Sequence, residues 1–130
     1  MTSQGSAYGR FQRAMRRGHL FHAELAAREL GRLSLADALD LALLIAEAEP
    51  QRWPQAAARW HARFVLEAKG IDLDESALAF AAIAGLRGKH RDLAARTLQQ
   101  LARSRGLASI DDAIARAGFE APRLSPDLPR

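Results

Sequence analysis

The chain has 130 residues, of which 48% are apolar and 26% charged, and this is typical of one folded domain. Ala, Leu and Arg dominate, whereas the Val, Ile and Thr that strands favour are scarce, so a β-rich fold is excluded. The absence of cysteine excludes disulfides, thiol catalysis and cysteine-based zinc sites.

Seven helices are predicted from apolar residues at helical spacing and from the Gly, Pro and capping residues between them. In chain order they cover residues 8–17, 19–32, 34–49, 54–69, 72–86, 90–105 and 109–117. Ser34 and Ser109 are expected to cap the third and seventh helices. The Pro-containing tail, residues 119–130, is expected to follow a single domain formed by residues 1–118.

The beginnings of three predicted helices are similar, which indicates an internal repeat. Residues 34–39, 72–78 and 109–114 each have a cap, acids in the first turn, and Ala followed by Leu or Ile. The fold class is therefore predicted to be all-α, with about seven helices, as a short array of helical hairpins behind a basic N-terminal helix. The three expected αα-hairpins cover residues 19–49, 53–87 and 90–117.

The stretch 19–52 resembles a degenerate tetratricopeptide repeat. Leu25-Ala26 stands where that repeat has Leu-Gly, Asp37-Ala38-Leu39 where it has Glu-Ala-Leu, and Pro50 where it has its final Pro. Three positions depart from the pattern, namely His22, Glu29 and Ile45. The second hairpin matches only in its second helix, at Ala77 and Ala84. The resemblance implies an interaction module whose first helices line a concave face.

The longest charge-free apolar run, residues 77–86, is predicted to form a buried core helix with Phe80 in its middle. As a helix it spans about 15 Å, half the core of a bilayer, so no membrane span is expected. Trp60 and Phe64 lie on the core stripe of the preceding helix. No secretory signal precedes the first helix, and a cytoplasmic protein is expected.

The motifs of most enzyme classes are absent: the sequence has no glycine-rich phosphate loop, nucleophile elbow or His-Glu-x-x-His. His19 and His22 can share a helix face near Glu24, but a metal site needs further ligands from elsewhere. The chain is therefore expected not to be an enzyme and to use no catalytic, cofactor-binding or metal-binding residues.

Charge is unevenly distributed along a chain whose net charge is +4, and this favours an acidic partner. The first helix of each expected hairpin is richer in Arg than the second, so stacked hairpins would present one basic layer. High Arg usage with little Lys and no Asn also indicates a high-GC, bacterial genome. The leading hypothesis is a binding module for an acidic protein or peptide segment. Its expected contacts are Arg28, Arg59, Arg63, Arg96 and Arg103, with Trp53 as an aromatic anchor.

Two other functions remain open. Nucleic-acid binding would use the basic N-terminal helix, although no helix-turn-helix with a recognition helix is evident. Its phosphate contacts would be Arg10, Arg13, Arg16 and Arg17. The third possibility is a small structural or oligomerising subunit that buries leftover apolar surface against itself.

Overall fold

The structure is a computed structural model that describes residues 6–119, and these residues form seven α-helices and no strand. The predicted all-α fold with about seven helices is confirmed. The elements are α1 (Ala7–Arg17), α2 (Leu20–Leu30), α3 (Leu35–Ala48), the 3-10 turn η2 (Pro50–Arg52), α4 (Trp53–Glu67), α5 (Leu73–Gly85), α6 (Arg91–Ser104) and α7 (Ile110–Arg116).

Three of the described helices begin at side-chain caps that satisfy their first free N–H groups, and the first is Ser6, whose Oγ accepts the backbone N–H of Gly9 at 3.0 Å. Ser34 Oγ accepts the backbone N–H of Asp37 at 3.1 Å, as expected. Asp72 and Glu75 form a reciprocal capping box at the start of α5. Ser109 was expected to cap α7 but makes no such bond, because its own backbone is already helical. Replacing Ser109 by Ala therefore removes no cap.

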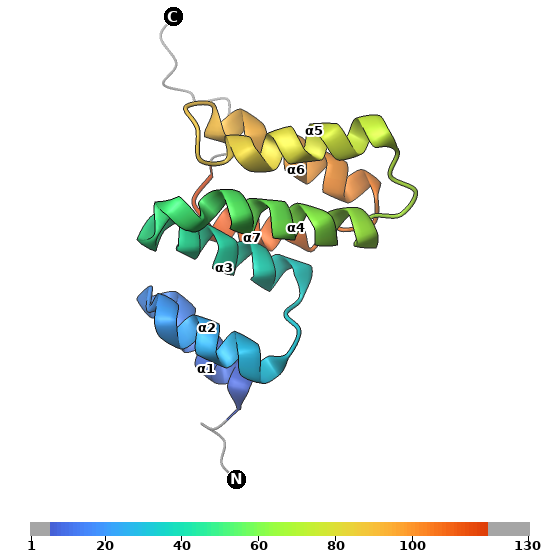
Figure 1. The fold of residues 1–130 in the computed structure, drawn as a ribbon. Coiled ribbons are helices and arrows are strands. Elements are labelled where there is room, and N and C mark those ends of the chain that lie inside the picture. The colour runs from blue at the N-terminus through green and yellow to red at the C-terminus, as the bar shows by residue number, and fades with distance from the viewer. Residues whose placement is uncertain (1–5, 120–130) are drawn as a thin grey trace, which may run out of the picture.

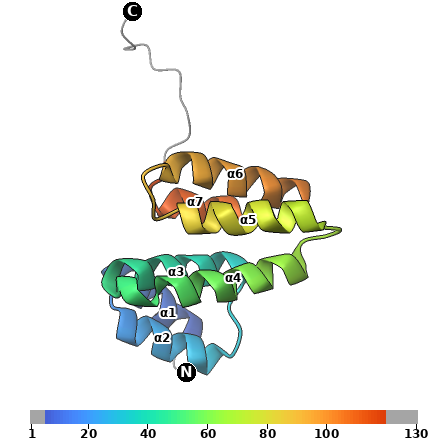
Figure 2. The ribbon, with the colours of Figure 1, turned by 45° about the horizontal axis from the view of Figure 1, so that its top comes forward.

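The helices pack in pairs that differ from the expected hairpins. The most extensive contacts between successive helices join α1 to α2, α3 to α4, and α5 to α6 (Figures 1 and 2). Gly18, in the left-handed conformation at φ 70°, reverses the chain between α1 and α2, and η2 reverses it between α3 and α4. The start of α3 is reached instead through the loop 31–34. Turn geometry, and not the repeat-like helix starts, thus decides which helices pair.

Two apolar cores hold the helices together. The larger core lies among α3, α4, α5, α6 and α7, and the smaller one joins α1 and α2 to α3. In the larger core the Trp60 ring stacks on Phe64 with 5.5 Å between ring centroids. The Trp60 Nε1 donates a hydrogen bond to the Leu35 carbonyl at 2.9 Å, so the one polar atom of this buried ring has a partner.

Phe80 was expected in the core but lies on the outer face of α5, with 47% of its surface exposed. The side of α5 that faces the core carries Ala79, Ala82 and Ile83 instead. The run 77–86 is apolar all round, so its pattern did not indicate which side would be buried.

The last described residue belongs to the packed structure. Phe119 is half-buried against the larger core, and the Arg91 guanidinium lies 4.7 Å from its ring centroid. The rest of the expected tail, residues 120–130, lies outside the described residues. Within residues 6–119, no helix has the length and apolar character needed to cross a membrane.

Candidate functional site

Helices α2 and α4 both pack on α3 and run in the same direction (Figures 1 and 2), and ion pairs between long side chains bridge them near both ends. At one end Arg52 contacts Glu24 at 2.6 Å, and at the other Arg32 contacts Glu67 at 3.1 Å. Glu67 also accepts from Arg63 at 2.7 Å. We call the charged strip between these ends the α2–α4 seam. It consists of Glu24, Arg28, Arg32, Arg52, Arg59, Arg63 and Glu67.

Two arginines occupy the middle of the α2–α4 seam. Arg28 lies one helical turn after Glu24 and so on the same side of α2, whereas Arg32 is in the loop that follows Gly31. Arg59 lies one turn before Arg63 and about midway between the two ion-paired ends on α4. Both are exposed, and neither forms an ion pair within residues 6–119. Both ends of the α2–α4 seam are therefore ion-paired, whereas Arg28 and Arg59 between them have no ion pair among residues 6–119.

Exposed apolar side chains flank this pair of charges. Phe21 and Leu25 on α2 are 70% and 49% exposed, and Leu66 on α4 is 84% exposed. The sequence analysis did not select these residues. The signal was present for Leu66, which falls off the stripe that buries Trp60 and Phe64. Cations beside exposed apolar groups form a surface suited to an amphipathic partner that carries acidic residues.

The other predicted partner contacts do not join the α2–α4 seam. Arg96 and Arg103 are on α6, which contacts neither α2 nor α4 among the described residues. Arg103 pairs with Asp111 at 2.8 Å. Trp53 starts α4 and is half-buried against the larger core. The expected single layer of first helices is therefore absent, because α4 packs on α3 and α6 packs on α5.

The four N-terminal arginines of the nucleic-acid hypothesis separate into two groups. Arg10, Arg13 and Arg17 line a shallow hollow of about 300 Å³ between α1 and α2, together with His19 and His22. Arg10 is ion-paired with Glu29 there. Arg16 points away from this hollow, into a groove on another side of α1. No cluster of three or more potential metal ligands occurs among the described residues.

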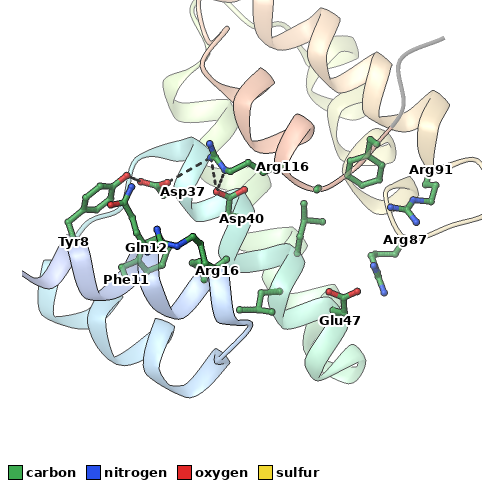
Figure 3. Close-up of a pocket in the computed structure, with 15 residues that line it drawn as sticks. Tyr8, Phe11, Gln12, Arg16, Asp37, Asp40, Glu47, Arg87, Arg91 and Arg116 are labelled. Carbon is green, nitrogen blue, oxygen red and sulfur yellow. Dashed lines mark hydrogen bonds and ion pairs between the residues drawn. The ribbon is translucent and has the colours of Figure 1, made fainter. Parts of the chain in front are cut away.

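The larger concavity is a groove of about 640 Å³ bounded by α1, α3, α7 and the start of α6 (Figure 3). Its floor is apolar, and charged side chains of both signs surround it. Arg116 contacts Asp40 at 2.7 Å and Asp37 at 4.0 Å, and Asp37 accepts a hydrogen bond from the Tyr8 hydroxyl at 2.9 Å. No sequence pattern indicated this cluster, because its members come from α1, α3 and α7.

Burial and pairing shift the pKa values of these groups. Burial raises the pKa of the Asp40 carboxyl above its usual range, and its hydrogen bond to Arg116 opposes that shift. The same bond raises the pKa of Arg116. The hydrogen bond to Asp37, supported by burial, raises the pKa of Tyr8. The cluster therefore pairs two carboxylates with one guanidinium, and it links α1 to α3 and α7.

The only tyrosine of the chain gives a direct test of this link. We expect Tyr8 to ionise above the ordinary pKa of about 10, because ionisation breaks its bond to Asp37 and places two negative charges together. A group with a raised pKa stabilises the fold below its unfolded pKa and loses that contribution as pH rises through its folded pKa. The bond should therefore stabilise the protein below about pH 10 and fail above it.

Tyrosinate absorbance during an alkaline titration measures this pKa. The Asp37→Ala variant should titrate closer to the ordinary value, and an unchanged midpoint in that variant would refute the link. Arg17→Gln, an exposed change away from the groove, is the control and should leave the titration as it is.

Comparisons of the chain with protein-family models, with curated proteins and with solved structures gave no match.

Proposed function

We propose that the protein is a non-catalytic interaction module that binds an acidic, partly apolar peptide segment along the α2–α4 seam. The observation that carries the proposal is the exposed pair Arg28 and Arg59 between two ion-paired ends, with Phe21, Leu25 and Leu66 beside it. The resemblance of residues 19–52 to a tetratricopeptide repeat remains a prediction, and it points to the same class of function.

The chemistry of arginine supports this choice of ligand. Each guanidinium offers a planar fork of donors that pairs with both oxygens of a carboxylate. Arg28 and Arg59 form no ion pair among residues 6–119, so Glu or Asp side chains of the ligand could pair with both. Apolar side chains of the ligand would cover Phe21 and Leu66, which otherwise remain in water.

The first test is binding of a fluorescent peptide of alternating Glu and Leu, measured by anisotropy. We expect Arg28→Glu combined with Arg59→Glu to weaken binding by about 10–100-fold, since a hydrogen bond to a charged group contributes roughly 1.5–3 kcal/mol. The same peptide with Gln in place of Glu should bind the unaltered protein weakly.

A matched control has the same change in net charge at another place. Arg96→Glu with Arg103→Glu alters α6, away from the α2–α4 seam, and should reduce binding by no more than about threefold through long-range charge. Equal losses in the two double variants would show that only net charge matters, and would refute the α2–α4 seam as the binding site.

Nucleic-acid binding is a second candidate, because Arg10, Arg13 and Arg17 share one hollow with two histidines. Phosphate binding releases condensed counterions and so weakens steeply with salt. From net charge alone we expect weak oligonucleotide binding at about 50 mM salt and none near 200 mM. Two results together would rank nucleic acid above the acidic peptide. The protein would bind an oligonucleotide with a submicromolar dissociation constant at the higher salt, and the double variant Arg13→Glu with Arg17→Glu would abolish that binding.

A further inference from the structure

The outer face of α5 is an apolar helix surface with no covering element among the described residues. Helix α5 packs on α6 and beside α4, and it lies at the surface in both views (Figures 1 and 2). Leu73 is 85% exposed; Phe80 is 47% exposed and contacts His61 of α4 at one edge of the face, with 5.1 Å between ring centroids. Ala77, Ala81 and Ala84 continue the same face at helical spacing, and all three are exposed. No charged side chain interrupts this face between Leu73 and Ala84.

The two ends of this face carry opposite charges. Asp72 and Asp74 lie at the start of α5, whereas Arg87 and Lys89 follow its end. Asp74, Arg87 and Lys89 are exposed and form no ion pair within residues 6–119. A surface with an apolar centre, an acidic end and a basic end is complementary to a copy of itself turned by 180°.

We infer that a second copy of this chain covers the face, with the two α5 helices antiparallel about a two-fold axis between Phe80 and Ala81. In this register each Phe80 lies opposite the partner's Ala81, so a large side chain meets a small one. Antiparallel alignment also places the helix dipoles favourably. The inference is independent of peptide binding at the α2–α4 seam, which lies on other helices.

The same register pairs the remaining positions consistently. Ala77 lies opposite the partner's Ala84. Helix α5 ends at Gly85, and the turn that follows it carries Arg87 and Lys89, so the antiparallel alignment brings Asp74 near this basic turn of the partner. Two-fold symmetry repeats every contact, so the rim of the interface holds opposite charges at both ends.

One crossing helix pair is at the small end of stable protein interfaces, so we expect a dimer with a dissociation constant on the order of micromolar. Sedimentation equilibrium over a range of protein concentrations measures it. Phe80→Glu should weaken the dimer by at least about thirtyfold, because it places a charge in the apolar interface. The helical circular dichroism should stay unchanged, because Phe80 is half-exposed in the monomer. A monomer at all concentrations of the unaltered protein would overturn the inference.

Charge reversal tests the antiparallel register itself. Asp74→Arg or Arg87→Asp alone should weaken the dimer by about tenfold, since each substitution places like charges together at two symmetric positions. The double variant restores opposite charges and should return the dissociation constant to within about threefold of the original. The register is wrong if neither single reversal changes the dissociation constant of the dimer. It is also wrong if the double variant dimerises more weakly than either single variant.

Cross-linking provides a readout that does not depend on affinity. The chain has no cysteine, so Ala81→Cys introduces a single thiol near the two-fold axis. Oxidation should convert this variant to a covalent dimer much faster than Gln55→Cys, a control at another exposed position, on α4. Equal rates for the two variants would count against the proposed axis.

Discussion

Phe64→Ala is expected to lower the free energy of unfolding by about 3–5 kcal/mol, because the side chain is completely buried. Its ring stacks on Trp60 at the centre of the larger core, and α4 and its neighbours cannot close the cavity that the substitution leaves. Urea denaturation followed by circular dichroism measures the change.

Phe80→Ala is the matched control, since it removes the same atoms from a half-exposed site. We expect the free energy of unfolding to fall by only about 1 kcal/mol, since only part of the phenyl ring is buried. The comparison is made at low protein concentration, where the inferred dimer does not contribute. Equal losses for the two variants would show that α5 faces the core differently from the structure described above.

Deletion of residues 1–17 is expected to unfold α2 as well as to remove α1. Phe11 and Ala14 are buried against Ala23 and Ala26, and together they form most of the smaller core. Without α1 these apolar side chains of α2 would face water, and an isolated helix of this length is marginal. The lost helical signal should therefore exceed that of α1 alone, by circular dichroism.

Deletion of residues 1–17 also removes the four arginines of the nucleic-acid hypothesis. Because Phe11 packs in the smaller core, loss of binding by the truncated protein could not be separated from loss of folding. Arg16→Gln, an exposed change on the same helix, should keep the unfolding free energy within about 0.5 kcal/mol. The expectation that α2 unfolds would be contradicted if the truncated protein lost only the helical circular dichroism of α1 and kept an unchanged denaturation midpoint.

The sequence by itself determined the helices and most of their ends. Ala, Leu and Arg have high helix propensities, and apolar residues recur at helical spacing. The bounds of the predicted helices differ from the observed bounds by a few residues. Local features, such as the Ser34 cap and Gly18, act within one turn of the chain, so they can be read from neighbouring residues. The core positions of Trp60 and Phe64 were also correct, because α4 has one clear apolar stripe.

Only the tertiary structure decided how these helices meet. The apolar run of α5 has no polar side, so packing against α6 and not periodicity turned Phe80 outward. Likewise, the five arginines predicted as partner contacts separate into two sets, one on α2 and α4 and the other on α6, since α4 pairs with α3 and α6 with α5. Long-range contacts between segments distant in sequence place Arg52 beside Glu24 and Tyr8 beside Asp37, and no local pattern encodes such neighbours.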